Sequence, residues 1–178
     1  MIKDIQVITG CMFAGKTTEL LNRLNKTNQN YLLIKPKIDT RNINNSIETH
    51  DGVQKKAITV SKVSDVFSEI DNIQLIAIDE AQFFPASIIE DINYLVSKNI
   101  QIVVAGLDKD YLNQPFGYMQ QIIGMAKSVT RLEAVCNKCS SPASYSHRIT
   151  DNSSSQILVG ASDQYEALCQ KCFDSYSL

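Results

Sequence analysis

A glycine-rich segment near the start of this 178-residue chain, Gly10–Thr17 (GCMFAGKT), limits its possible folds more than any other part. It has the P-loop spacing Gly-x-x-x-x-Gly-Lys-Thr, follows an apolar run at Ile5–Thr9 and opens a helical pattern at Lys16–Lys26. The glycines let backbone N–H groups turn towards phosphate oxygens, and the following helix adds the positive end of its dipole. The segment therefore predicts a nucleotide phosphate site, in which Lys16 reaches the outer phosphates and Thr17 ligates Mg²⁺.

Beyond this segment, apolar runs alternate with helical patterns, which is typical of an α/β protein with a parallel sheet. Apolar runs predict further strands at 31–35, 57–60, 75–79 and 101–106. The spacing of apolar residues predicts helices at 86–98 and 118–127, and residues 41–52 and 150–156 have the composition of loops. We expect a P-loop (RecA-like) core, with a central, mostly parallel sheet flanked by helices.

An acidic pair ends the apolar run at 75–79, in the segment LIAIDEAQ. An acidic residue at this place is the usual Mg²⁺-side partner of a P-loop, and Asp79 fits that role. Strand alternation predicts that Glu80 faces the opposite side, where a nucleophile could approach. Glu80 could activate water, as in helicase-like ATPases, or accept a proton from a substrate hydroxyl, as in a kinase. Taken alone, the pair could instead cap the next helix or be solvated.

Two Cys-x-x-Cys pairs lie near the C-terminus, formed by Cys136, Cys139, Cys169 and Cys172. Four thiolates suit a structural, tetrahedral Zn²⁺, which would replace the apolar core that this part lacks; a redox pair or unrelated thiols are the alternatives. We place a boundary near Val135 and expect a P-loop ATP-binding α/β domain at 1–135 and a small zinc-binding lasso module at 136–178. The fifth cysteine, Cys11, is interpreted as a small side chain in a tight turn.

Charge and composition argue against nucleic-acid and membrane partners. The formal net charge is −2, and the residues from 136 onwards carry more acidic than basic side chains. The basic residues there are Lys138, Arg148 and Lys171, and the acidic ones are Asp151, Asp163, Glu166 and Asp174. No run approaches the roughly 20 apolar residues of a membrane span, and the N-terminus is too charged for a signal peptide. We therefore expect a soluble, cytoplasmic protein.

Seven segments, taken in order, resemble the thymidine kinase family of the zinc-containing, tetrameric type. They are GCMFAGKTTEL, KPKIDTR, THDG, DEAQFF, GLDKDYLNQPFG, CNKC and ILVGASDQYEALCQKC. The resemblance runs from about Gly10 to Cys172. It implies transfer of the γ-phosphoryl group of ATP to the 5′-hydroxyl of thymidine, and commonly of deoxyuridine, in nucleotide salvage for DNA synthesis. It also implies a homotetramer and feedback inhibition by dTTP.

The same resemblance assigns roles to individual residues. Glu80 would be the base that takes the 5′-hydroxyl proton. ATP and Mg²⁺ would be bound by Gly10, Cys11, Met12, Phe13, Ala14, Gly15, Lys16 and Thr17 of the P-loop, and by Asp39, Arg41, Asp79 and Gln82. Thymidine would be bound beneath a zinc-held lid by Met12, Leu107, Tyr111, Gln156, Ile157, Leu158, Val159, Gly160 and Tyr165. Arg41 could instead be a solvated surface residue, and the two tyrosines could serve only packing.

Two other classes of protein remain as alternatives. A RecA- or helicase-type ATPase, suggested by the letters DEAQ, usually needs a second similar domain or a neighbouring subunit's arginine, and the chain after Val135 is too short for such a domain. A regulatory module with an inactive site is disfavoured because Lys16, Thr17, Asp79 and Glu80 are all present. A lid that excludes water favours a kinase, since water in the site would hydrolyse ATP.

Overall fold

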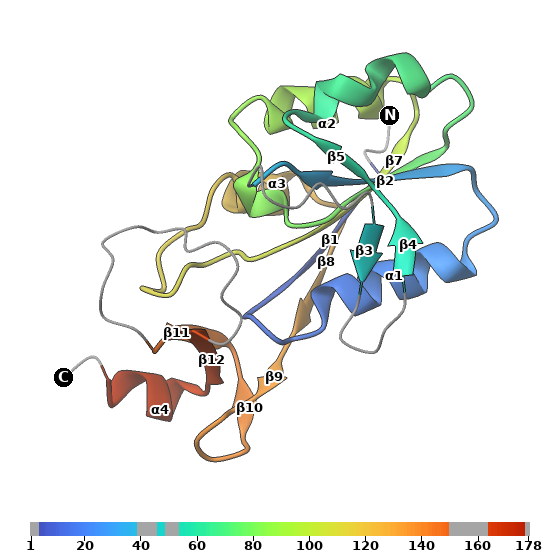
Figure 1. Cartoon of the computed structure of the whole chain (residues 1–178). Helices are drawn as coiled ribbons and strands as arrows, with labels where there is room; N and C mark the ends of the chain where they lie inside the picture. The colour runs from blue at the N-terminus through green and yellow to red at the C-terminus, as the bar shows by residue number, and fades with distance from the viewer. Residues whose placement is uncertain (1–3, 39–45, 49–53, 150–163, 177–178) are drawn as a thin grey trace.

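The structure, a computed structural model, describes residues 4–38, 46–48, 54–149 and 164–176 (Figure 1). Its centre is a six-stranded parallel sheet in the order β5-β2-β6-β7-β1-β8. The strands are β1 (Ile5–Gly10), β2 (Tyr31–Pro36), β5 (Ile58–Val60), β6 (Leu75–Ile78), β7 (Gln101–Gly106) and β8 (Ser128–Leu132). Because all six run in the same direction, the segments that follow them meet at one edge of the sheet, where parallel sheets bind ligands.

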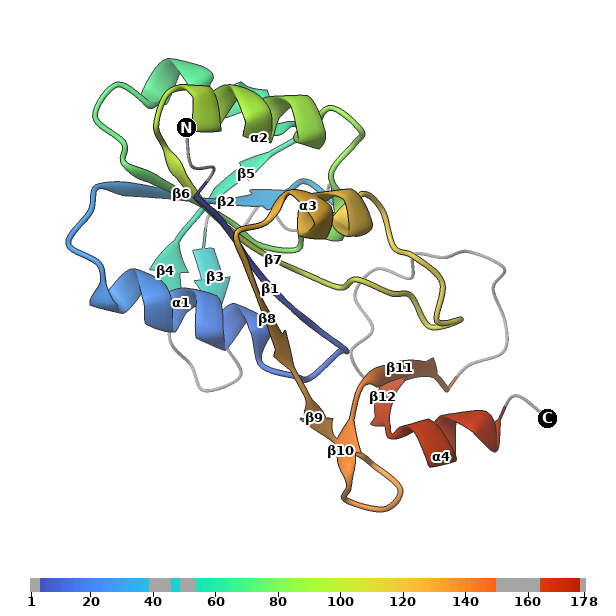
Figure 2. The same ribbon diagram turned by 180° about the vertical axis from the view of Figure 1, so that it is seen from behind.

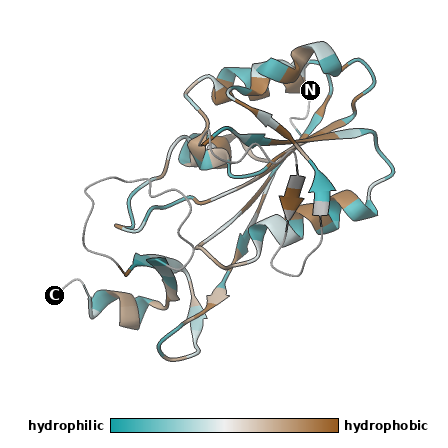
Figure 3. Cartoon of the chain, in the orientation of Figure 1, coloured by the Kyte–Doolittle hydropathy of each residue, from teal (hydrophilic) through white to brown (hydrophobic). Residues whose placement is uncertain are grey.

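Helices cover both faces of this sheet (Figures 1 and 2). One face carries α1 (Lys16–Lys26) and the short hairpin of β3 (Ser46–Glu48) and β4 (Gln54–Lys56); Leu20 and Leu21 of α1 are buried there with Ile8 of β1. The other face carries α2 (Ile88–Ser97), α3 (Met119–Met125) and the 3₁₀ segment η1 (Val63–Glu69). Burial on both faces explains why the central strands are almost continuously apolar (Figure 3).

The sequence predictions for this core are confirmed in outline, with two corrections. Five of the six central strands and all three predicted helices are present within a few residues of their expected bounds. β8 was not predicted, because its sequence SVTRL belongs to a half-exposed edge strand and has no apolar run. The predicted loop at 41–52 contains β3, whose Ile47 is buried in the apolar cluster beneath α1.

Beyond β8 the chain leaves the sheet and forms a set of small elements, β9 (Ala134–Val135), β10 (Pro142–Ala143), β11 (Tyr145–Arg148), β12 (Tyr165–Leu168) and α4 (Gln170–Asp174). β9 pairs with β10, and β11 pairs with β12, both antiparallel. The buried hydrophobic residues of this part form a small cluster of cysteine, alanine and leucine that includes Cys11 of the P-loop. Among the described helices, none combines the length and the apolar character needed to cross a membrane.

Candidate active site

The P-loop connects β1 to α1 at the carboxyl edge of the sheet, and both of its glycines are required by the backbone. Gly15 caps α1 in the left-handed region, at φ 81°, where a side chain is strained. A Cβ on Gly10 would lie 2.3 Å from the carbonyl oxygen of Leu132 in β8. Both glycines have a positive φ, 150° at Gly10 and 81° at Gly15, so the glycine spacing seen in the sequence reflects two unusual dihedral angles and one close approach between strands.

Lys16 lies inside this loop, where its Nζ donates a hydrogen bond of 2.7 Å to the carbonyl oxygen of Cys11. Burial lowers the pKa of its ammonium group, and the charges of Glu80 and Asp79 oppose that shift. Glu80 contributes the largest of these charge effects, and its neighbour Asp79 binds the hydroxyl of Thr17 in the P-loop. The P-loop cation and the acidic pair thus form one electrostatic unit, although they come from opposite sides of β7.

Asp79 follows β6 and is buried, with 5% of its surface exposed. Its Oδ2 accepts a hydrogen bond of 3.0 Å from the hydroxyl of Thr17, and its Oδ1 accepts one of 3.0 Å from the backbone N–H of Glu80. Burial, followed by the charge of Glu80, raises the pKa of Asp79 to about 7, against the lowering effect of the Thr17 hydrogen bond. A carboxylate beside a hydroxyl at a phosphate site is a donor set that fits Mg²⁺.

Glu80 is not part of a strand, so the prediction that strand alternation would orient it is wrong. β6 ends at Ile78, and Glu80 has φ 51°, a left-handed conformation that is strained for a glutamate. The turn continues into η2 (Ala81–Phe83). Glu80 is therefore oriented by a tight turn after the strand, and residues held in this way cluster at functional sites.

Gln82 fixes the carboxylate of Glu80. Its Nε2 donates a short hydrogen bond to Glu80 Oε2, and its Oε1 accepts one of 3.0 Å from the backbone N–H of Leu107. Gln82 is 3% exposed, and its close packing requires two glycines: a Cβ on Gly117 would lie 2.2 Å from its carbonyl oxygen, and one on Gly106 would lie 2.8 Å from Oε1. The buried amide thus ties Glu80 to the end of β7.

Of the residues expected to contact the nucleoside, the structure brings Tyr111 and Tyr165 together. Tyr111 lies in the loop after β7 and Tyr165 begins β12; both rings lie against the guanidinium of Arg148, which sequence reasoning did not identify. Met12 approaches the same region, since its backbone N–H donates to Ser146 Oγ of β11 at 2.9 Å. No local pattern in the sequence signals the contacts of Arg148. Tyr111 lies more than thirty residues before it, and a segment of loop composition separates it from Tyr165.

Other residues near the acidic pair were also not predicted. The ring of Phe83 in η2 packs edge-on against Phe116, with ring centroids 5.4 Å apart. Asp108, just after Leu107, accepts a hydrogen bond of 2.9 Å from Arg131 in β8 and contributes to the charge around Lys16. Seven residues expected at the site lie outside the described residues, namely Asp39, Arg41, Gln156, Ile157, Leu158, Val159 and Gly160.

Cys11 makes specific contacts, whereas the sequence suggested only a small side chain in a tight turn. It is 4% exposed, and its thiol donates a hydrogen bond of 3.2 Å to the carbonyl oxygen of Ala143 in β10. The side chain also belongs to the small apolar cluster of the C-terminal part, with Cys136 and Leu168. Its packing therefore joins the start of the P-loop to the elements around the four remaining cysteines.

The sulfur atoms of Cys136, Cys139, Cys169 and Cys172 all lie within 4.8 Å of one another. Four Zn–S bonds of about 2.3 Å in a tetrahedron separate the sulfurs by about 3.8 Å, so this cluster fits a structural zinc ion. Hydrogen bonding with the neighbouring cysteine sulfurs, first that of Cys169, raises the pKa of Cys172 to about 12. Four thiolates repel one another at these distances unless a cation lies between them, and a bound Zn²⁺ would provide that positive charge.

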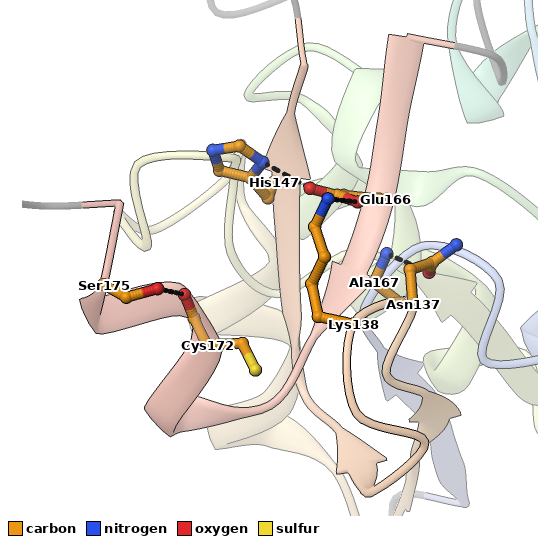
Figure 4. Close-up of polar contacts among 7 residues, drawn as sticks. All are labelled: Asn137, Lys138, His147, Glu166, Ala167, Cys172 and Ser175. Atoms are coloured by element: carbon orange, nitrogen blue, oxygen red, sulfur yellow. Dashed lines mark hydrogen bonds and ion pairs between the residues drawn. The ribbon is translucent and has the colours of Figure 1, made fainter.

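A polar network joins the two cysteine pairs (Figure 4). Asn137, within the first pair, exchanges hydrogen bonds of 2.9 and 3.0 Å with Ala167 of β12, just before the second. The buried carboxylate of Glu166 lies 3.1 Å from Lys138 Nζ and 3.2 Å from His147 Nδ1. These contacts hold the first pair against β11 and β12, so the geometry of the sulfur cluster does not rest on the sulfur atoms alone.

The fold and the site define a class of protein: an α/β P-loop protein with an acidic pair facing its phosphate loop. The thymidine kinase family model matches residues 3–173. A thymidine kinase from Chloroflexus aurantiacus (strain ATCC 29366 / DSM 635 / J-10-fl) is 35% identical over 181 residues, which cover 96% of this chain and 94% of that protein. The chain belongs to the thymidine kinase family, and it is an ATP-dependent nucleoside kinase.

Similar solved structures include two of Pif1 helicases. Bacteroides Pif1 bound to ssDNA has a TM-score of 0.36 and 18% identity, and the match covers 67% of this chain and 31% of that one. Pif1 helicases described as unwinding forked dsDNA give a TM-score of 0.38 and 14% identity, covering 74% and 40%. The chain spans less than half of either helicase, and a likeness of this size does not support the helicase-type alternative.

Proposed function

We propose that this protein is a thymidine kinase that transfers the γ-phosphoryl group of ATP to the 5′-hydroxyl of thymidine, and also of deoxyuridine. The products with thymidine are dTMP and ADP, in the salvage of pyrimidine deoxynucleotides for DNA synthesis. The observation that carries the proposal is the Glu80 carboxylate, which Gln82 fixes beside the P-loop. A general base must be held in this way to accept a proton from an alcohol while that alcohol attacks a phosphoryl group.

Glu80 accepts the 5′-hydroxyl proton as the oxygen bonds to the γ-phosphorus, and the bond to the β–γ bridging oxygen breaks to release ADP. Lys16 and the backbone N–H groups of Gly10–Thr17 bind the phosphates, with Asp39, Arg41 and Gln82 as further residues of the ATP side. Thr17 and Asp79 hold Mg²⁺, which neutralises charge on the phosphates when bound. Its binding requires the ionised form of Asp79, whose pKa is about 7.

The nucleoside is bound between the two parts of the chain, the ATP-binding part at 1–135 and the zinc-binding part at 136–178. Met12, Leu107, Tyr111 and Tyr165 contact it, together with the segment from Gln156 to Gly160. Support for this arrangement comes from the hydrogen bond between Met12 and β11, and from the contact of both tyrosines with Arg148. The zinc ion anchors the second part, which excludes water during transfer.

The proposal includes three further properties, which are carried over from the family by analogy. The protein forms a homotetramer and acts in the cytoplasm. dTTP inhibits it by feedback, with its phosphates at the P-loop, so dTTP competes with ATP. Failure of dTTP to compete with ATP contradicts this part of the proposal without affecting the assignment of the reaction.

The test is phosphoryl transfer from radiolabelled ATP to each of the four deoxynucleosides and to deoxyuridine, with wild type, Glu80→Gln and Glu90→Gln. We expect thymidine and deoxyuridine to be the preferred acceptors, and the Glu80 variant to lose about 100-fold or more in kcat while still binding ATP. Glu90 is exposed on α2, so its variant is the matched control and keeps wild-type activity. ATP hydrolysis stimulated by DNA, without transfer to any nucleoside, refutes the proposal.

A further inference from the structure

Arg148 is a buried cation with no place in the reaction described above. It ends β11 and is 7% exposed, which is rare for an arginine without partners that replace water. A guanidinium group stays protonated at any pH that a protein meets, so its charge cannot be removed by titration. Its surroundings must therefore be built to accept a permanent positive charge, and both described aromatic partners belong to the nucleoside side of the site.

The first partner is Tyr111, at the tip of the loop after β7. The guanidinium carbon of Arg148 lies 3.8 Å from the centroid of the Tyr111 ring, in direct stacking contact. The backbone of this loop is fixed independently, because Asp110 Oδ1 accepts hydrogen bonds of 2.9 Å from the N–H groups of Leu112 and Gln114. The backbone thus sets the position of Tyr111, and Arg148 sets the plane of its ring by covering one face.

The second partner is Tyr165, which pairs directly with Arg148 across the β11–β12 ladder. Arg148 Nε and one terminal guanidinium nitrogen donate to the Tyr165 hydroxyl oxygen, at 3.1 and 2.8 Å. Hydrogen bonds from a charged donor are among the stronger ones in proteins. Because the phenol oxygen accepts from the guanidinium on one side, its own hydrogen is directed away from Arg148, which makes Tyr165 an oriented donor.

A lysine could not perform both tasks. A planar guanidinium can lie flat against the Tyr111 ring, which a rounded ammonium group cannot, and the paired contact with Tyr165 needs the fork of N–H groups that only a guanidinium presents. One rigid group therefore fixes two aromatic side chains that come from different parts of the chain. Neither the P-loop nor the acidic pair lies among the partners described for it.

We propose that Arg148 is a positioning residue for the nucleoside: its guanidinium fixes the ring of Tyr111 and the hydroxyl of Tyr165, and it thereby sets the affinity for the nucleoside and not for ATP. This inference rests on the proposed function. It identifies as specificity-determining a side chain that acts through two others. An uncharged, flat base with a hydrogen-bond acceptor is the ligand chemistry that a held ring and an oriented phenol donor recognise.

The experiment measures KM for thymidine, KM for ATP and kcat in Arg148→Met, Arg148→Lys, Tyr165→Phe and the double variant Arg148→Met/Tyr165→Phe. The matched control is Lys109→Met. Lys109 is exposed and lies 5.9 Å from the ring of Tyr145, so it makes the other cation–π contact between the same loop and β11. Thermal stability and zinc content are measured for every variant, and Tyr165→Phe keeps the ring packing if the Arg148 variants fold poorly.

We expect Arg148→Met to raise KM for thymidine about tenfold or more with KM for ATP unchanged, the effect of losing one charge-assisted contact that orders the site. Arg148→Lys recovers little, Tyr165→Phe raises the same KM, and the double variant is no worse than Arg148→Met alone. Lys109→Met behaves like wild type. Equal changes in both KM values, or lower thermal stability with both unchanged, refute the positioning role while the proposed function stands. A wild type that phosphorylates no nucleoside refutes the proposed function, and this inference with it.

Discussion

Gly106→Ala tests whether the support of Glu80 is as tight as the structure shows. Gly106 ends β7 and is not among the residues proposed to bind either substrate, but a Cβ there would lie 2.8 Å from Gln82 Oε1 and 2.9 Å from Met119 Sδ. Both neighbours are almost fully buried, so neither can move into solvent. An ordinary contact of about 3.4 Å or more requires Gln82 Oε1 to move by about 0.6 Å.

That displacement breaks the support of Glu80. The bond from Leu107 N–H to Gln82 Oε1 is already 3.0 Å long, and moving the oxygen away by this amount takes it to the limit of a hydrogen bond. The amide then no longer holds the Glu80 carboxylate, and a lost hydrogen bond to a charged group is worth about 1.5–3 kcal/mol. We expect kcat to fall about 10- to 100-fold and overpacking to cost about 1–3 kcal/mol of unfolding free energy.

Steady-state kinetics and urea unfolding measure the two effects, and Gly124→Ala is the matched control. Gly124 lies in α3 with nothing within 4 Å of its added Cβ, so this variant keeps wild-type kcat and gains about 0.5–1 kcal/mol from lower backbone entropy in the unfolded chain. A Gly106→Ala enzyme with wild-type kcat would show that Gln82 does not position Glu80, and the reasoning from packing to catalysis would fail.

Other predictions concern the buried acid, the metal cluster and the contact between the two parts of the chain. The pKa of Asp79 is raised from 3.8 to about 7, so between these pH values the folded state holds a proton that the unfolded state has lost. Without ligands, the free energy of unfolding therefore falls as pH rises from about 4 to about 7. Urea unfolding at pH 5 and pH 8 should show this fall in wild type and not in Asp79→Asn, which should be inactive. Cys172→Ser should lose bound zinc by elemental analysis and lower the Tm, and one retained zinc per chain would contradict the four-sulfur site. Ser146→Ala leaves the Met12 N–H without the hydroxyl that it binds at 2.9 Å, so KM for ATP should rise several-fold, whereas an unchanged value would mean that β11 does not support the P-loop.

Most of the core could be predicted because its signals are local. The P-loop, the strand before it and the helix after it are contiguous, and the structure places α1 at Lys16–Lys26 as expected. The apolar run that precedes Asp79 likewise marks a strand buried on both faces. β8 escaped prediction because an edge strand needs no apolar run.

The orientation of the site could not be predicted, because it depends on contacts between distant residues. Glu80 is turned by a left-handed residue and held by Gln82, which in turn is bound to Leu107. In the sequence Arg148 is only one charge among those of the C-terminal part, yet it is buried between two tyrosines from separate segments. Neither arrangement has a sequence period or motif, since each arises from how β7, β11 and β12 meet.

The most direct test of the reaction at Glu80 is where the γ-phosphoryl group goes in a single turnover. Enzyme in excess over γ-labelled ATP is mixed with saturating thymidine, and the label is divided between dTMP and inorganic phosphate. With wild type, nearly all of it should appear in dTMP, and Glu80→Gln should slow dTMP formation about 100-fold or more without diverting the label to water. Label that appears mainly as inorganic phosphate, or dTMP formation at the wild-type rate in the variant, would contradict Glu80 as the base for a nucleoside hydroxyl.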